Sequence, residues 1–289
     1  MFKKSILLIP FLLLAKPVKI DEILTPKNQF KLNLNISYTN IQKKSGTIAL
    51  ITYQTANGDF VNIPTYIESE NSNQDYINYS IGIRYGLNNK TEIYSNLNYF
   101  MNSTHINGET SYSNKFKRGF NNFNIGLTYK IKKETDTPSL LIDINIDAIE
   151  RVRFTSKYKN MYFKNYTLNI TSYYTVDPIV FLINASYRIN KKTYYKNESI
   201  DNGNQIIISP QIYFAVNPFT SINWGIKYEY HSKDKIDDKI VSNNGSEISY
   251  LLGVSYEINF KNTINFNYEK KDTSTYTSST INLNLTHKY

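Results

Sequence analysis

Apolar and polar residues alternate along most of this chain, most clearly in its last segment. Ile281, Leu283 and Leu285 share one face of that segment, and Asn282 and Asn284 share the other. Period-two alternation indicates a β-strand with different surroundings on its two faces. The pattern recurs and predicts an all-β, antiparallel up-and-down barrel of twelve strands. The expected strands are 30–41, 76–87, 91–101, 121–131, 138–149, 165–175, 179–189, 204–215, 220–231, 247–258, 263–271 and 278–289.

Tight and long connections separate these strands in turn. Turn-forming residues make up the tight ones, which are Asn88–Lys90, Lys133–Thr137, Val176–Pro178, Asn217–Pro218 and Lys261–Asn262. The long ones are 42–75, 102–120, 150–164, 190–203 and 232–246, with a shorter link at 272–277. Bacterial outer-membrane barrels have short periplasmic turns and long external loops. An even strand count then predicts that both termini are periplasmic, and that the last strand pairs with the first.

The first long connection leaves the strand count open. Residues 48–54 and 61–67 could form an extra hairpin in the wall, which would give fourteen strands. Their alternation is poor, so we prefer twelve strands, with this hairpin extending outside the cell within one loop.

Aromatic positions distinguish a membrane barrel from a secreted soluble β protein, which would also alternate. Two sets of outward aromatic residues are expected to flank an aliphatic band, as in membrane barrels. The periplasmic set is Phe30, Tyr85, Tyr129, Tyr174, Phe181, Phe214, Tyr256 and Tyr289. The outer set is Tyr38, Tyr79, Tyr99, Phe123, Tyr166, Tyr187, Tyr228 and Tyr250.

The amino-terminal region has the composition of an export signal. A basic start at Lys3 and Lys4 precedes an apolar run from Ser5 to Ala15, which is shorter than the about 20 residues of a membrane-spanning helix. We expect residues 1–15 to be a signal peptide, 16–29 a periplasmic segment and 30–289 the barrel; an uncleaved anchor is the alternative. The expected location is the outer membrane of a Gram-negative bacterium.

The composition of the chain excludes some bonds and some classes of partner. The chain of 289 residues has no cysteine, so disulfides and thiolate metal sites are excluded. Its formal net charge of +9 is scattered over loops rather than gathered on one face, so no nucleic-acid partner is expected. We expect outer-membrane lipid and lipopolysaccharide, the barrel assembly machinery during insertion, and small solutes as partners of a monomer. Basic loops are interpreted as solvated, with contact to anionic lipid headgroups as the alternative.

Catalytic and metal-binding patterns are absent from the sequence. In outer-membrane phospholipase, a Ser follows the catalytic His by two positions on one strand. His105, His231 and His287 are followed at that spacing by Asn107, Lys233 and Tyr289. Three dispersed histidines offer no zinc spacing, and 234–238 is interpreted as a solvated loop rather than a calcium site. We therefore predict no enzyme, no catalytic or metal residues and no cofactor, with an outer-membrane hydrolase as a remote alternative.

The face opposite the lipid is expected to carry function. The predicted lumen-lining residues are Lys31, Arg84, Glu92, Lys130, Asp143, Asp147, Arg188, Lys227, Glu229, Glu257 and Glu269. Ionisable groups inside a barrel of this size either line a pore or pair with one another and seal it. The sequence thus predicts a passive, porin-like transport channel, or alternatively a plugged structural or surface-interaction barrel with binding loops.

One segment resembles a known family. The run Tyr85-Gly86-Leu87-Asn88-Asn89-Lys90-Thr91-Glu92-Ile93 is similar to a hairpin of the outer-membrane family called MetA-pathway of phenol degradation. Thr137-Pro138-Ser139-Leu140 resembles a second feature of that family, whereas its Pro-Thr-Gly motif is missing at Ile149–Val152. The resemblance implies a transporter-like barrel that passes hydrophobic or aromatic compounds.

Overall fold

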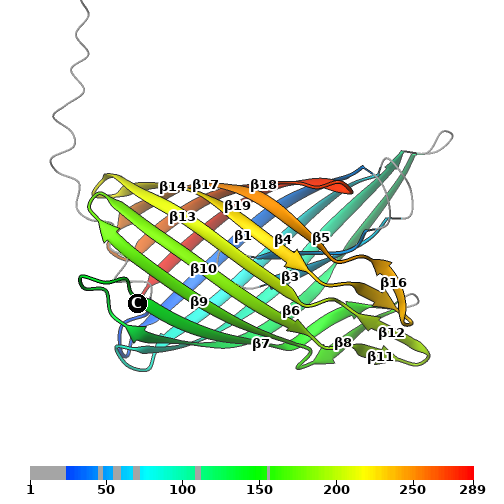
Figure 1. Cartoon of the computed structure of the whole chain (residues 1–289), viewed down its shortest axis with the longest axis horizontal. Coiled ribbons are helices and arrows are strands. Elements are labelled where there is room, and N and C mark those ends of the chain that lie inside the picture. The colour runs from blue at the N-terminus through cyan, green and yellow to red at the C-terminus, as the bar shows by residue number, and fades with distance from the viewer. Residues whose placement is uncertain (1–23, 45–47, 55–59, 68–71, 108–111, 155–156) are drawn as a thin grey trace, which may run out of the picture.

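The chain folds into a closed antiparallel β-barrel (Figure 1). The structure, a computed structural model, describes residues 24–44, 48–54, 60–67, 72–107, 112–154 and 157–289. The expected signal peptide, 1–15, and residues 16–23 lie outside this described part. Within it, twelve strands form the ring, and neighbours in the following list are paired. They are β1 (Phe30–Lys43), β4 (Ser72–Gly86), β5 (Thr91–Asn107), β6 (Tyr112–Lys132), β7 (Leu140–Arg153), β9 (Asn165–Val176), β10 (Ile179–Asn190), β13 (Gln205–Asn217), β14 (Thr220–His231), β17 (Gly245–Asn259), β18 (Asn262–Asp272) and β19 (Tyr276–Lys288).

The last strand closes the ring against the first. The β1–β19 ladder runs from Lys31 opposite Lys288 to Lys43 opposite Tyr276. The Tyr289 amide also donates to the Phe30 carbonyl at 3.0 Å. A closed ring leaves no unpaired strand edge, which would otherwise invite association with another chain. The predicted fold class and the predicted pairing of the terminal strands are confirmed.

The remaining strands are not members of this ring. β2 (Ile48–Gln54) and β3 (Phe60–Ile67) form a separate two-stranded sheet, so the preferred count of twelve is correct and fourteen is wrong. β8 (Tyr158–Tyr162) pairs with the end of β7. The short strands β11 (Thr193–Tyr195), β12 (Glu198–Asp201), β15 (Asp234–Ile236) and β16 (Lys239–Ser242) join two connections into one small sheet.

The two ends of the barrel differ, as the connections predicted. Tight links at 87–90, 133–139, 177–178, 218–219 and 260–261 lie at one end with Tyr289, which we call the tight-turn end (Figure 1). The extra strands lie at the opposite end, which we call the loop end. There the expected loop 102–120 is wrong, because most of it is strand: the β5–β6 ladder continues to Asn107 opposite Tyr112. A paired hairpin satisfies its own backbone groups, so it can project beyond the wall.

Along the strands, apolar side chains are exposed on the outside of the barrel and polar side chains are buried inside it, the reverse of the pattern in a soluble protein. On β1, Leu34 and Ile36 on the outer face are 40% and 48% exposed, whereas Ser37 and Thr39 on the inner face are at most 2% exposed. No helix in the described ranges is long and apolar enough to cross a bilayer. Aliphatic side chains outside and polar ones inside match hydrocarbon around the ring and a polar interior within it. The interior is therefore the candidate site.

Candidate functional site: the barrel interior

Asparagine side chains cover much of the inner wall. Asn78 Nδ2 donates to Asn98 Oδ1 at 3.2 Å, and Asn145 Nδ2 donates to Asn124 Oδ1 at 3.3 Å. Other polar atoms in this layer, including Asn35 Oδ1, Asn98 Nδ2 and Asn124 Nδ2, are buried without a hydrogen-bond partner in the protein. Buried polar groups without protein partners bind ordered water. The inner wall is therefore suited to water or to polar groups of a solute.

Three predicted residues come together at the tight-turn end, where they hold residues 24–26. Glu92 on β5 is fully buried, and its Oε2 accepts hydrogen bonds from the Thr25 amide at 2.6 Å and from Thr25 Oγ1. Arg84 on β4 forms an ion pair with Glu92 Oε1. Lys31 Nζ on β1 donates to the Leu24 carbonyl at 3.1 Å. Glu92 and Lys31 thus bind the segment that precedes the barrel, and Arg84 pairs with Glu92.

An apolar cluster completes this contact. Leu24 is 5% exposed and packs against Leu141, Tyr173 and Val180 of the inner wall. These residues lie on β7, β9 and β10, two to four strands around the ring from β5, which carries Glu92, so the segment contacts several strands of the inner wall. Leu24 and Thr25 therefore occupy the interior at the tight-turn end, and Pro26 is exposed.

The hairpin that resembles the phenol-degradation family, Tyr85–Glu92, is where this segment docks. A Cβ atom added at Gly86 would lie 2.0 Å from the Pro26 carbonyl oxygen, so only glycine permits this approach. Glu92 binds Thr25. Lys90 N donates to Asn88 Oδ1 at 2.8 Å, which shapes the turn. Two residues of the quoted motif therefore have a structural role at this contact.

A second polar cluster lies toward the loop end. Arg188 Nη2 is 2.7 Å from Asp147 Oδ2, and both side chains are 1% exposed. Lys164 Nζ lies 3.2 Å from Glu150 Oε2. Asn165 Nδ2 donates to both carboxylates. Charges removed from water in this way are stable only as hydrogen-bonded pairs.

The start of β3 contacts this cluster. The Phe60 ring centre is 5.0 Å from Arg188 Cζ, and Asn122 Nδ2 donates to the Phe60 carbonyl at 3.1 Å. Asn62 Nδ2 donates to Glu150. The neighbouring Val61 is fully buried in an apolar cluster with Ile41, Tyr76, Phe100 and Tyr276. The β2–β3 hairpin is not part of the wall, as expected, but the expectation that it extends away from the barrel is wrong for residues 60–62, which are buried against the inner face.

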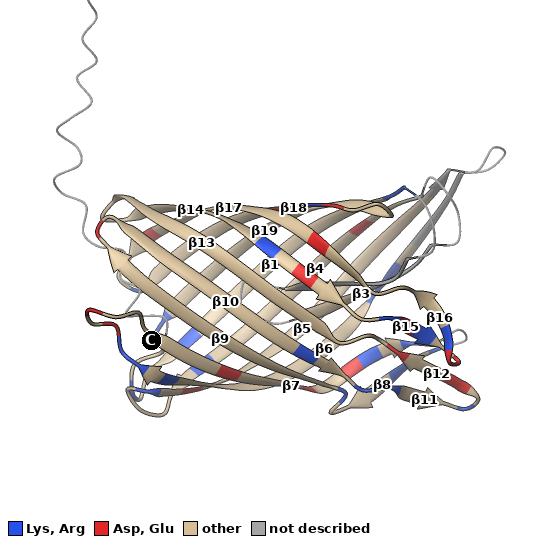
Figure 2. Ribbon diagram, viewed as in Figure 1, with Lys and Arg blue, Asp and Glu red and all other residues tan. Residues whose placement is uncertain are grey.

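Further charges pair with one another. Lys227 lies 2.5 Å from Glu269, and Lys271 lies 2.9 Å from both Glu229 and Glu247. Figure 2 shows charged residues along several ring strands as well as in the loop-end sheet.

The last three predicted residues are Asp143, Lys130 and Glu257. Asp143 accepts hydrogen bonds from Tyr94, Thr128 and Asn169. Lys130 and Glu257 are half-buried, and both lie toward the tight-turn end of their strands. That all the named residues line a solute path stays a prediction.

Strict alternation missed Glu150 because of a β-bulge. Phe123 on β6 pairs with Ile149, but the next residue, Asn124, pairs with Asp147, so Ala148 is extra. An extra residue reverses which face the following side chains occupy. Asp147 and Glu150, three apart, therefore both point inward. Lys164 was expected in the loop 150–164. The only sequence signal for its place beside the inner wall was that the expected strand begins at the next residue, Asn165.

A serine, a histidine and an aspartate meet near the loop end. His105 Nε2 lies 3.4 Å from Ser103 Oγ and 3.3 Å from Asp75 Oδ2. The serine precedes the histidine by two positions, a spacing the sequence comparison did not consider. A serine–histidine–carboxylate relay needs the hydroxyl and the carboxylate on different ring nitrogens, whereas here both approach Nε2. The arrangement therefore does not form such a relay.

An apolar cavity of about 380 Å³ lies in the wall at β9, β10, β13 and β14. Its lining includes outer-face residues such as Phe181 and Trp224, together with Tyr173 and Leu182, which belong to the inner cluster. Pro210 also lines the cavity, and the β13–β14 ladder has no pairs between Ile208 and Gln211. Proline has no amide hydrogen to donate, which weakens pairing locally. This part of the wall can accommodate an apolar group.

The loop-end sheet joins the 190–203 and 232–246 connections. Ile200 on β12 pairs with Ile236 on β15, and the Gly203 amide donates to Asp234 Oδ1 at 2.9 Å. Burial raises the pKa of the Asp234 carboxyl above its usual range. At the surface, Lys192 lies 2.5 Å from Asp238. Their hydrogen bond raises the pKa of Lys192 and lowers that of Asp238. In the described residues, no three His, Cys, Asp or Glu side chains are grouped to hold a metal ion.

Comparisons with known proteins rest on structure alone. No family model and no curated protein matches the sequence. The fold is similar to that of the COG4313 outer membrane channel from Pseudomonas putida F1, with a TM-score of 0.64 and 9% identity over 91% of this chain and 96% of that one. It is also similar to the translocator domain of autotransporter NalP from Neisseria meningitidis, with a TM-score of 0.53 and 7% identity over 90% and 88% of the two chains. The fold and its neighbours define the class: a transmembrane β-barrel of the outer-membrane type.

Proposed function

We propose that this protein is a passive channel for small solutes in a bacterial outer membrane, with its tight-turn end in the periplasm. The observation that carries the proposal is a closed barrel with an apolar outer face and inward polar atoms that have no protein partner. A sealed scaffold gains nothing from such groups, because an apolar interior would avoid their desolvation cost. A P. putida protein of similar fold is named an outer membrane channel, which supports the same role.

Hydrophobic or aromatic compounds are the proposed solutes. The likeness of Tyr85–Glu92 to the phenol-degradation family supports this class, as does the cavity lined by Phe181, Leu182 and Trp224. Apolar lining with a few polar groups is typical of sites for such molecules. Passage would be diffusion without energy coupling, and it would require displacement of residues 24–26 and of the β2–β3 hairpin.

A plugged structural or surface-interaction barrel is the second candidate. Leu24 and Thr25 at one end and Phe60–Asn62 at the other favour it, because both groups of residues are buried in the interior. The sheet that joins two loops would then present a binding surface outside the cell.

Planar-bilayer recording and solute uptake into liposomes test the proposal. We expect discrete current steps from the purified protein, and uptake of toluene-sized aromatic compounds above that of protein-free liposomes. An electrically silent protein that admits no solute, even when the hairpin is released by mutation, would leave only the plugged barrel.

A further inference from the structure

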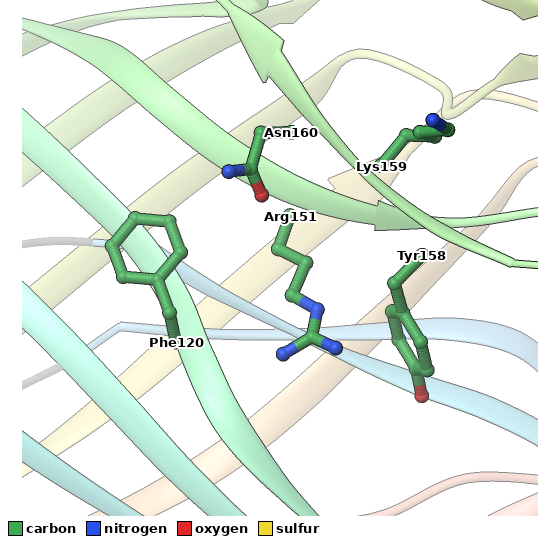
Figure 3. Close-up of a pocket in the computed structure, with 5 residues that line it drawn as sticks. All are labelled: Phe120, Arg151, Tyr158, Lys159 and Asn160. Carbon is green, nitrogen blue, oxygen red and sulfur yellow. The ribbon is translucent and has the colours of Figure 1, made fainter.

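A cleft opens in the wall at the loop end, where β6 and β7 separate. Their ladder ends with Asn122 opposite Glu150; beyond it β6 pairs with β5, and β7 pairs with β8. A cavity of about 610 Å³ lies there (Figure 3). Its lining residues are Phe120, Arg151, Tyr158, Lys159 and Asn160.

Arg151 lies between the two aromatic rings of this cleft (Figure 3). Strand alternation places it on the face opposite the buried neighbours Glu150 and Val152. Its Cζ atom is 4.5 Å from the Tyr158 ring centre, and Lys117 Nζ is 5.9 Å from the same ring. A guanidinium stacked on an aromatic face keeps its N–H edge free to bind an anion.

Gly119 on β6 makes room for this guanidinium. A Cβ atom added there would lie 2.2 Å from Arg151 Nη1, and the backbone φ angle of +154° disfavours other residues. The position of Arg151 is thus determined by the backbone of the neighbouring strand, as in a preformed site.

The two chain segments that form the cleft are rich in basic residues. The segments 112–120 and 151–164 contain no Asp or Glu. They carry eight basic residues: Lys115, Lys117, Arg118, Arg151, Arg153, Lys157, Lys159 and Lys164. Of these, Lys164 forms an ion pair with Glu150. The two segments have a net positive charge, which attracts anions.

The cleft lies beside the aromatic boundary of the membrane. Ile149 pairs with Phe123, an expected outer-girdle residue, and with Tyr162 on β8. Tyr162, Phe163 and Phe116 are 66%, 57% and 60% exposed. Exposed aromatic rings concentrate at the level of lipid headgroups. Arg151, two residues beyond Ile149, therefore stands at headgroup depth.

We propose that this cleft binds the anionic headgroup of a membrane lipid at the loop end of the barrel. The phosphate accepts hydrogen bonds from the Arg151 guanidinium, with Lys159 and Asn160 at its edge. The acyl chains lie along the exposed aromatic rings. This site is independent of solute passage, because it lies outside the inner wall.

Native mass spectrometry of the purified barrel with added lipid tests the site. The probes are phosphatidic acid and phosphatidylcholine with the same acyl chains, because only the first carries a net negative charge. We expect tighter binding of phosphatidic acid, and about tenfold weaker binding by Arg151→Gln, as for loss of a charge-assisted hydrogen bond. Lys261→Gln is the matched control: it removes an equal charge near an aromatic ring, Phe260, at the opposite end.

Two more variants separate geometry from charge. Gly119→Ala should displace the guanidinium and weaken binding although every charge remains. Because this change strains the backbone, Arg151→Lys serves as a second variant that keeps the charge but lacks the two-pronged donor, and it should bind more weakly than the parent.

Three results would overturn the proposal. These are equal affinity for the two lipids, unchanged affinity in Arg151→Gln, and displacement of phosphatidic acid by equimolar inorganic or phenyl phosphate. The last result would identify a site for free anions rather than for a lipid.

Discussion

Removal of the Phe60 ring is expected to release the β2–β3 hairpin and to increase conductance. The ring is 2% exposed and lies over the Arg188 guanidinium at 5.0 Å. A buried Phe→Ala change costs about 3–5 kcal/mol, of which a cation–π contact supplies about 0.5–2 kcal/mol. Since about 1.4 kcal/mol is a tenfold change, the ratio of docked to released hairpin should fall by roughly two to three and a half powers of ten.

Single-channel recording of Phe60→Ala checks this expectation. The variant should show more frequent or larger open events than the parent protein. Phe181→Ala is the matched control, because this ring is 48% exposed on the outer face of β10. Release can be followed separately with Val61→Cys, since the chain has no other cysteine. If the Cys at 61 reacts with maleimide in Phe60→Ala but the conductance stays at the parental value, the hairpin does not close the path. If this Cys stays protected from maleimide, the Phe60 ring contributes less to docking of the hairpin than expected.

Three further expectations follow from the contacts. Glu92→Gln should loosen residues 24–26, so that maleimide labels a Leu24→Cys reporter at least about tenfold faster; unchanged labelling would show that Glu92 does not hold the segment. Lys130→Glu should shift the reversal potential toward cation selectivity, and an unshifted potential in an open channel would remove Lys130 from the path. Because burial raises the pKa of Asp234, the loop-end sheet should be most stable below the usual Asp range and lose stability as pH rises through the raised pKa. Asp234→Asn should flatten that dependence in amide exchange at Gly203, and an equal pH dependence in both proteins would contradict it.

Local pattern was sufficient for the wall of the barrel. Strand alternation depends on neighbours two positions apart, so strands such as 179–189 and 220–231 could be placed within one residue of β10 and β14. Turn residues between them determined which ends meet. The antiparallel pairing of 278–289 with 30–41 followed, because a closed up-and-down ring joins its last strand to its first and an even strand count makes these two antiparallel.

Strand alternation failed at the β-bulge on β7, where one extra residue is inserted. The bulge at Ala148 depends on how β7 pairs with β6, and the two consecutive apolar residues Ala148 and Ile149 could equally mark the end of the strand. Glu150, expected in the connection 150–164, therefore points inward from the strand and contributes to the polar cluster that binds Asn62. Likewise, the extension of β5 and β6 through the expected loop 102–120 arises from their mutual pairing rather than from apolar periodicity.

By itself, the sequence determined an all-β barrel with an apolar outside, a polar inside and unequal ends. Only the tertiary structure decided what fills the interior. Thr25 and Glu92 are 67 residues apart, and Asn62 and Glu150 are 88 apart. Their side chains meet because ring closure brings distant strands around one small volume, where a buried carboxylate must find donors from whichever segment lies within reach. Such contacts depend on the closed geometry, and no spacing along the chain encodes them.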